Sequence, residues 1–241
     1  MFTNERFDEI IEILKEHKHI DVKTLSKMLY VSEATIRRDL NEMKNLGLIV
    51  RNHGGAILPE NVDEVSIFVR MNENARDKEL AASNALHFIP EFRSVFIDSS
   101  STALALATRM DLSFKTIVTN NLQTAIQLSK KPNINLISLG GNIHYNTISS
   151  TGSFTLRQLE DFSFDLMILS CTAVTNKDIF ENSLEQKELK LAALKRSKTK
   201  LLLFDHNKYT AHATYRLGSL SDFDIVVNDL ECANIHSKTN D

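Results

Sequence analysis

Cysteine is rare in this chain: only Cys171 and Cys232 occur among its 241 residues. The two are too far apart in the sequence to have metal-ligand spacing, so we expect a reduced cytoplasmic protein without disulfides, cofactor or bound metal. No apolar run approaches the roughly 18 residues of a membrane span, and nothing resembles a signal peptide. A net charge of −3 argues against a protein that coats nucleic acid without regard to its sequence.

Glycine is also scarce, with seven residues in all. Four of the seven form two pairs, Gly54-Gly55 and Gly140-Gly141. Glycine reaches backbone conformations that other residues avoid, and it lets the backbone approach another group closely. We therefore interpret both pairs as specific turns, the first within a hairpin and the second after a strand.

Residues 21–58 have the pattern of two short helices followed by a hairpin. Asp21 and Ser32 are suited to cap consecutive helices, whose apolar residues recur at helical spacing. Strands are predicted over residues 48–51 and 56–58, on either side of the first glycine pair. Helix, turn, helix and hairpin in this order predict a winged helix-turn-helix, which lays its second helix in a DNA major groove.

The outward face of the second helix and the hairpin supply the predicted DNA contacts. Either Arg37 or Arg38 is suited to bond a guanine edge through two N–H groups, and the other to hold phosphate; the sequence leaves this choice open. The alternative is a merely solvated helix face, and His53 is equally suited to shape the hairpin turn. The predicted DNA contacts are Ser32, Glu33, Thr35, Arg37, Arg38, Asn41, Arg51, His53 and Gly54.

The sequence patterns divide the chain into a small and a larger domain. We predict a winged helix-turn-helix domain over residues 1–58, a linker over 59–74, an α/β domain over 75–236 and a flexible tail over 237–241. In the larger domain apolar strands alternate with helices, which is typical of a mainly parallel sheet covered on both faces. The strands are expected over residues 94–98, 116–119, 135–139, 165–170, 200–204 and 224–228.

Polar or glycine-containing loops follow four of these strands. Because parallel strands end at one edge of a sheet, we expect these loops to form a ligand site there. Serine hydroxyls and free N–H groups at a helix start suit an anion, whereas amides suit sugar hydroxyls. The alternatives are a helix cap for the serines, a plain chain turn for the glycines and a surface ion pair between Asp205 and Lys208. The candidate effector contacts in these loops are Asp98, Ser99, Ser100, Ser101, Thr102, Asn120, Gly140, Gly141, Asp205 and Lys208.

From about residue 5 to residue 230 the chain resembles the DeoR family of transcriptional repressors. The resemblance implies a sensor domain related to sugar-phosphate isomerases, which binds a phosphorylated sugar or a related metabolite and releases the protein from a sugar-catabolic or phosphotransferase operon. It also adds Thr119 to the expected effector contacts. Operators with two-fold symmetry imply a homodimer or homotetramer. The matching residues are Val31-Ser32, 35–40, 51–56, 98–102, Thr119-Asn120, Gly140-Gly141, Gly152, Lys190, Asp205 and Lys208.

Two departures from the family pattern bear on the effector. Ser100 stands where the family usually has glycine, and residues 171–183, where a glycine-rich segment is usual, contain no glycine. We expect the second departure to change which effector is bound, or to abolish binding.

Two other functions remain open. The first is a residual sugar-phosphate isomerase, for which Glu185, Glu188 and Asp205 are possible bases; no catalytic motif accompanies them, and we expect no enzyme activity. The second is a DNA-binding regulator whose larger domain serves only in assembly. Neither reading involves a membrane partner.

Overall fold

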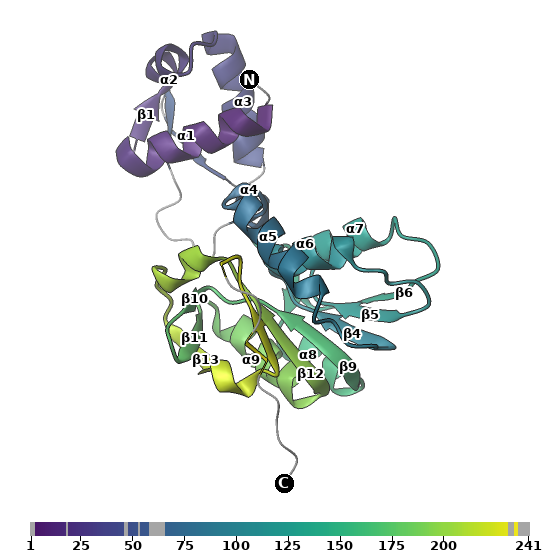
Figure 1. Cartoon of the computed structure of the whole chain (residues 1–241). Coiled ribbons are helices and arrows are strands. Elements are labelled where there is room, and N and C mark those ends of the chain that lie inside the picture. The colour runs from purple at the N-terminus through teal and green to yellow at the C-terminus, as the bar shows by residue number, and fades with distance from the viewer. Residues whose placement is uncertain are drawn as a thin grey trace. The chain divides into compact units, whose positions relative to one another are not determined.

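The structure is a computed structural model that describes residues 3–17, 19–45, 48–52, 54–57, 66–230 and 234–235 (Figure 1). The chain separates into two compact units, Met1–Glu73 and Asn74–Asp241. Of the predicted linker, residues 59–65 lie outside the described part, as does the predicted tail. Ile67–Asn72 form the helix α4 and belong to the first unit. None of the described helices has the length and apolar character needed to cross a membrane.

The first unit contains the predicted helix-turn-helix and hairpin. The hairpin strands pair antiparallel, and a third strand, which was not predicted, extends them to a sheet with the order β1-β3-β2. That strand has only three residues, too few to show an alternating pattern in sequence. The elements are α1 (Thr3–His17), β1 (His19–Asp21), α2 (Val22–Met28), α3 (Glu33–Asn45), β2 (Val50–Asn52) and β3 (Gly55–Ile57).

One apolar cluster holds the three helices of the first unit together. Ile10 and Leu14 of α1, Leu25 of α2, and Ile36 and Leu40 of α3 are all fully buried in it. Each helix contributes residues three or four positions apart, which lie on one face of a helix. The helical spacing in the sequence therefore predicted this core.

A buried ion pair crosses the same core between α1 and α3. Arg6 Nε lies 2.5 Å from Asp39 Oδ2, and Arg6 Nη2 lies 3.0 Å from Asp39 Oδ1. Both side chains are buried, and the two parallel bonds fix their relative orientation. Asp39 therefore faces the interior, although it directly follows the exposed Arg37 and Arg38.

We expect Arg6→Met to lower the free energy of unfolding of the first unit by about 3–5 kcal/mol, because the Asp39 carboxylate would stay buried without its cation. Amide hydrogen exchange of α3 in the full chain measures the loss. Arg37→Ala is the matched control, because its ion pair with Glu33 is exposed and is worth about 0.3–0.5 kcal/mol. Equal effects of the two substitutions would contradict the assigned role of Arg6.

The second unit is built on a seven-stranded sheet with the order β15-β14-β12-β9-β4-β5-β6. Its six longer strands are parallel, and β15 pairs antiparallel with β14. The mainly parallel sheet is confirmed, and the unpredicted β15 extends it at one edge. The strands are β4 (Ser94–Ile97), β5 (Thr116–Thr119), β6 (Asn135–Ser138), β9 (Phe164–Leu169), β12 (Ser197–Leu203), β14 (Ile225–Val227) and β15 (Asn234–Ile235).

Helices cover both faces of this sheet, as predicted. Along β4, Val95 and Ile97 pack on the face covered by α5, α6 and α7, whereas Phe96 packs on the opposite face with α8 and α9. Successive side chains of a strand point to opposite faces, which is why one short apolar run supplies both cores. Figure 1 shows α5, α6 and α7 together along one side of the sheet. The helices are α5 (Ala75–Leu86), α6 (Ser101–Arg109), α7 (Leu122–Leu128), α8 (Ser153–Glu160) and α9 (Leu184–Lys195).

The glycine-free segment after β9 is not a plain loop. It forms the strands β10 (Ala173–Val174) and β11 (Asp178–Glu181), which make a three-stranded antiparallel sheet with β13 (Tyr215–Ser219). A second hairpin, β7 (Asn142–His144) with β8 (Ser149–Thr151), follows the second glycine pair. Sequence reasoning missed these strands and α8, because runs of two to eight residues carry too little periodic pattern.

Candidate DNA interface and effector site

Side-chain hydrogen bonds cap the starts of α2 and α3. Asp21 Oδ1 accepts from Thr24 N at 2.9 Å and caps α2, while Ser32 Oγ accepts from Thr35 N at 3.2 Å at the start of α3. Between them Tyr30 has a φ of 55° and is 94% exposed. Ser32 and Thr35 therefore have a structural role that is compatible with their predicted place at DNA.

The predicted DNA contacts of α3 lie on its exposed side. Arg38 is exposed and pairs with no described residue. Arg37 Nη2 lies 3.3 Å from Glu33 Oε2 one turn earlier, and Asn41 Oδ1 accepts from Arg51 Nη1 at 2.7 Å. The last bond joins α3 to β2, so the helix and the hairpin are linked at the surface that the sequence predicts to face DNA.

The hairpin that follows is tightly packed. A Cβ at Gly55 would clash with the carbonyl oxygen of Ile20, which explains a glycine at this position. Gly54 is exposed at the turn, and His53 lies outside the described residues. His19 Nε2 lies 3.1 Å from Asn52 Oδ1 beside this turn. Sequence reasoning did not single out Asn52, although its place in the Arg-Asn-His-Gly-Gly segment was a signal for it.

In the second unit the strand order reverses between β4 and β9. From β4 the chain runs outward through β5 and β6, and it then returns to the other side of β4 through β9, β12 and β14. No crossover covers the carboxyl ends of the strands at such a reversal, where ligands of open α/β sheets bind. Asp98, Asn120 and Ser170 directly follow β4, β5 and β9, and Asp205 lies two residues after the end of β12.

Lys190 of α9 occupies the centre of this edge. Its Nζ lies 3.1 Å from Asp98 Oδ2, forms an ion pair with Glu181 Oε1 and donates to Ser170 O at 2.8 Å. Burial opposes the charge on Lys190, but the Glu181 and Asp98 carboxylates more than offset it and raise the pKa of Lys190. Lys190 is therefore a charged group whose positive charge is already matched by protein.

Asp98 and Ser100 are held mainly by the protein itself. Asp98 Oδ1 accepts from Ser100 N at 3.0 Å and from Ser100 Oγ at 2.5 Å, and Asp98 Oδ2 accepts from Ser170 N at 3.2 Å. Ser100 Oγ also caps α6, whose first turn contains the buried Ser101 and Thr102. Ser100 has a φ of −84°, so the position usually occupied by glycine needs no left-handed backbone here.

Gln186 joins two of the predicted strand-end regions to β8. Its Oε1 accepts from Ser99 Oγ at 3.1 Å and lies 3.4 Å from Asn120 Nδ2, and its Nε2 lies 2.6 Å from Ser149 Oγ. Sequence reasoning missed Gln186. A signal was present, because Ser183 and Gln186 have the Ser-x-x-Gln spacing of a helix start, and Ser183 does cap α9. The tertiary fold directs the amide away from the cap and into the site.

The second glycine pair is a structural turn. A Cβ at Gly141 would clash with Thr155 Oγ1, and Gly141 has a φ of +151°. Gly140 O accepts from Thr155 Oγ1 at 2.8 Å and from Gln158 Nε2 at 2.9 Å. The backbone of Gly140 thus binds α8, which supports the chain-turn alternative. Thr119 is likewise used internally, since its Oγ1 accepts from Asn121 N at 3.1 Å.

Asp205 has no partner for either of its carboxylate oxygens within the described part of the chain, although it is fully buried. The surface ion pair between Asp205 and Lys208 was therefore a wrong alternative, because β12 carries Asp205 into the interior while Lys208 stays half-buried. Asn120 Oδ1, Ser150 Oγ and Ser170 Oγ are also buried and unbonded. Buried polar groups are normally bonded, so these atoms mark unused hydrogen-bonding capacity.

Cys171 is a core residue rather than a reactive thiol. It is buried, and burial, together with the Glu181 carboxylate, raises its pKa to about 12. A thiol with so high a pKa carries almost no thiolate at neutral pH.

The two units define a winged helix-turn-helix protein with a larger α/β domain whose strand ends are polar. The chain belongs to the DeoR family: residues 6–62 match the DeoR-like helix-turn-helix domain, and residues 73–230 match the DeoR C terminal sensor domain. It is a DNA-binding transcriptional regulator of this family.

Curated relatives align along almost the whole chain. The HTH-type transcriptional regulator GolR of Listeria innocua is 32% identical, with 95% of this chain and 91% of the relative covered. The glycerol-3-phosphate regulon repressor of Escherichia coli is 32% identical, with 95% and 92% covered. The L-fucose operon activator of Escherichia coli is 31% identical, with 93% and 94% covered.

Among solved structures, ribose 5 phosphate isomerase A from Neisseria gonorrhoeae is similar with a TM-score of 0.40 and 16% identity, over 56% of this chain and 53% of that one. A likeness this distant carries no argument about activity.

We expect Lys190→Met to lower the free energy of unfolding of the second unit by about 3–5 kcal/mol, because two buried carboxylates would lose their shared cation. Urea denaturation followed by circular dichroism measures the change. Lys198→Met is the control, because Lys198 pairs with Asp165 at the surface with 76% of its side chain exposed. A Lys190→Met protein as stable as this control would refute the central role of Lys190.

Proposed function

We propose that the chain represses an operon of carbohydrate or sugar-phosphate metabolism and is released from its operator by a phosphorylated sugar. The observation that carries the proposal is the buried, unbonded Asp205 carboxylate at the strand reversal. If this edge of the sheet had only a structural role, an apolar residue would be favoured at position 205, because a buried charge without a partner is costly. The repressor assignment draws on the name of the glycerol-3-phosphate regulon repressor.

The expected DNA contacts fit the exposed side of α3. Arg38 has no carboxylate partner in the part of the chain that the structure describes, whereas Arg37 forms an ion pair with Glu33. We therefore assign the base contact to Arg38 and a phosphate contact to Arg37. Ser32, Thr35, Asn41, Arg51, His53 and Gly54 complete the proposed interface. Action on chromosomal DNA places the protein in the bacterial cytoplasm.

The expected effector contacts divide into two kinds by charge. Lys190 is already matched by two carboxylates, so it has little attraction left for phosphate. Lys208 makes no ion pair with any described carboxylate and is the better phosphate partner. The Asp205 carboxylate repels phosphate and accepts hydrogen bonds, so it suits the hydroxyl groups of a sugar, together with the free Asn120 Oδ1 and Ser170 Oγ.

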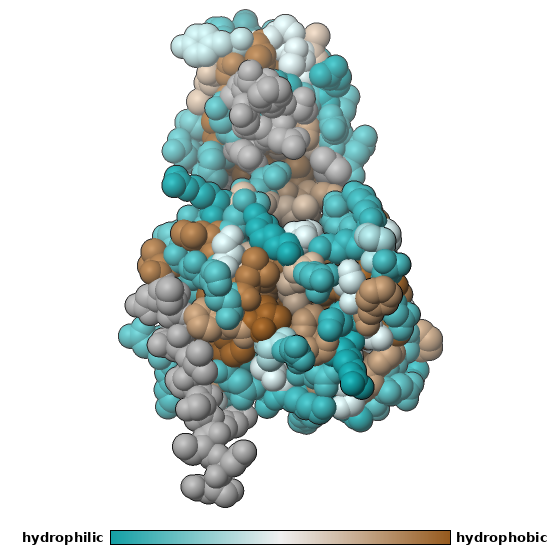
Figure 2. All heavy atoms as spheres, turned by 45° about the vertical axis from the view of Figure 1, so that its right-hand side comes forward, coloured by the Kyte–Doolittle hydropathy of each residue, from teal (hydrophilic) through white to brown (hydrophobic). Residues whose placement is uncertain are grey.

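We propose that the protein acts as a homodimer or homotetramer. Figure 2 shows hydrophobic groups gathered at the surface of the second unit. Such surfaces are typical of contacts between proteins. Release follows by linkage: the effector must bind the conformation that leaves DNA more tightly than the one that binds it.

The isomerase and assembly-only alternatives have less support. Of the three candidate bases, Glu185 and Glu188 are exposed on α9, outside the buried strand-end region, so they are poorly placed to move a proton at a bound sugar. The third, Asp205, does lie in that region, but no catalytic motif accompanies it. The relatives described above are transcriptional regulators, and we propose that this chain is not an enzyme. A turnover assay on pentose and hexose phosphates tests that exclusion directly.

Arg38→Ala should weaken binding to DNA from upstream of the chain's own gene cluster by about 5- to 150-fold, the value of one bidentate base contact. Fluorescence anisotropy at several salt concentrations measures it. Arg93→Ala, an exposed arginine of the second unit, is the control. If Arg38→Ala instead weakens all DNA sequences equally and lowers the salt slope by about one, Arg38 is a phosphate contact.

Asp205→Asn should abolish release by the effector while it raises the free energy of unfolding by at least about 1 kcal/mol, because a neutral amide costs less to bury than a carboxylate. Operator binding in the absence of effector should be unchanged. Thermal unfolding and anisotropy with a panel of phosphorylated sugars measure both quantities, with Glu188→Gln as the control. A protein that is destabilised by Asp205→Asn and still released would show that Asp205 is structural.

A further inference from the structure

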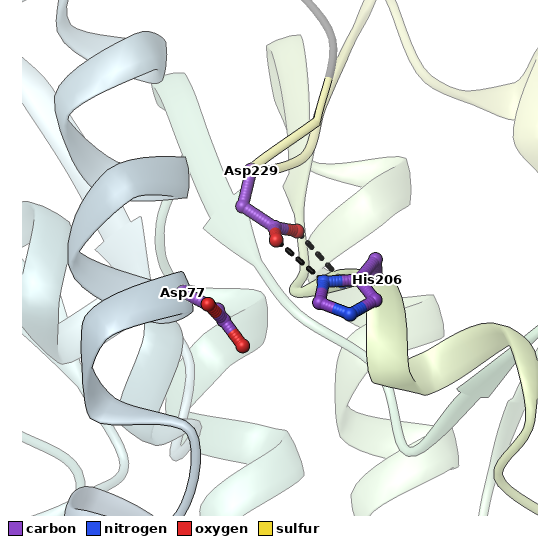
Figure 3. A group of neighbouring side chains, drawn as sticks. All are labelled: Asp77, His206 and Asp229. Atoms are coloured by element: carbon purple, nitrogen blue, oxygen red, sulfur yellow. Dashed lines mark hydrogen bonds and ion pairs between the residues drawn. The ribbon is translucent and has the colours of Figure 1, made fainter.

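Three potential metal ligands outside the expected effector set converge beside the strand ends. Asp77 lies in the first turn of α5, His206 begins the 3₁₀ helix η1 (His206–Tyr209), and Asp229 follows β14. Figure 3 shows the two carboxylates and the imidazole facing one another from these three segments. One ligand atom from each residue lies within 4.8 Å of the other two. Because these residues are far apart in the sequence, the tertiary fold brings them together.

Hydrogen bonds within the cluster hold His206 and Asp229 together, and one bond from a neighbouring residue reaches Asp77. Asp229 Oδ1 accepts from His206 N at 2.7 Å, and Asp77 Oδ2 is bonded by Asn207 Nδ2 at 3.3 Å. His206 Nδ1 and Asp229 Oδ2 lie 2.6 Å apart. Asp229 is nearly buried, whereas Asp77 and His206 are half-buried, so an ion has access from one side.

The charges in the cluster do not balance. Neither Asp77 nor Asp229 forms an ion pair with any lysine or arginine in the part of the chain that the structure describes. The buried Asp205 directly precedes His206 and adds a third carboxyl group. Neither oxygen of the Asp205 carboxyl group has a hydrogen-bond partner among the described residues. One imidazole therefore stands against three carboxyl groups, and a bound cation would offset this excess.

We propose that Asp77, His206 and Asp229 bind one first-row divalent metal ion. Two carboxylate oxygens and an imidazole nitrogen suit Zn²⁺ or Mn²⁺, whereas Mg²⁺ and Ca²⁺ prefer oxygen ligands alone. Ligand atoms around a tetrahedral ion lie about 3.4 Å apart at metal–ligand distances of about 2.1 Å. Binding therefore replaces the hydrogen bond between His206 Nδ1 and Asp229 Oδ2, which lie 2.6 Å apart, so these two atoms must separate. Asp77 moves inward by side-chain rotation, and its partial exposure allows this.

Binding would join α5 to the ends of β12 and β14. Without the ion, the described contacts between Asp77 and these strand ends include only the long hydrogen bond from Asn207. The ion would fix η1, which also contains Lys208, in one position. The metal site does not depend on the identity of the effector, and it can be tested without DNA or sugar.

Calorimetric titration of the metal-free full chain with Zn²⁺ tests the proposal, with Mg²⁺ titrated in parallel. We expect one Zn²⁺ per chain at micromolar or lower concentration and a rise in unfolding temperature that a chelator reverses. Asp77→Asn and His206→Gln should each weaken binding by at least about 100-fold, which is the upper end of what loss of an outer-shell partner costs. His212→Ala is the control, since His212 is exposed nearby in sequence.

Several outcomes would overturn the site: no stoichiometric Zn²⁺ binding, Mg²⁺ binding of equal strength, or unchanged affinity in Asp77→Asn. Asp77 is partly exposed near a helix start, so its substitution by Asn leaves the fold intact, and circular dichroism verifies this. As a second readout, Mn²⁺ bound to the full chain should show an electron paramagnetic resonance signal that changes in His206→Gln and not in His212→Ala. If His206 and Asp229 form only an ordinary ion pair, His206→Gln would leave the Mn²⁺ signal unchanged, as His212→Ala does.

Discussion

The arrangement of the strand ends in the second unit depends on the buried ammonium group of Lys190. Lys190 joins Asp98 after β4, the carbonyl of Ser170 after β9 and Glu181 at the end of β11. A charge is tolerated in an interior only when its partners are complete. The ends of two central strands, the small sheet and α9 must therefore meet in one arrangement, and they do so where the strand order reverses and no crossover covers the edge. The position of every other group at this edge follows from that arrangement.

The same constraint operates in the first unit, where the buried Arg6–Asp39 pair joins α1 to α3. In both units the charges with complete partners belong to the framework. The groups that we propose for ligand contact have no side-chain partner among the described residues: Arg38 on the exposed side of α3, and Asp205 and Lys208 at the sheet edge. The charge of a residue did not show whether it belongs to the framework or contacts a ligand. Lys190 and Lys208 are the same residue type at the same edge, yet only Lys190 is assigned to the framework.

Much of the fold could be predicted because the signals are local. Helical spacing identified Ile36 and Leu40 as core residues, and apolar runs such as 95–97 identified the parallel strands. Elements without a period were missed, among them β1, the β10–β11 hairpin and α8, since two to eight residues carry too little pattern. The lack of glycine in residues 171–183 was therefore interpreted only as a change in effector binding. The segment in fact supplies Glu181 to the ion pair with Lys190.

The sequence by itself determined the family, the winged helix-turn-helix and the parallel sheet, because capping residues, periodic apolar residues and glycine turns act over a few positions. It also determined which strands end in polar residues. Only the tertiary structure decided which of those residues form hydrogen bonds within the protein, because partners such as Gln186 and Asn120 come from distant segments. The meeting of Asp77, His206 and Asp229 was likewise beyond the sequence, because the crossovers of the sheet, and no spacing rule, bring residues 77, 206 and 229 together.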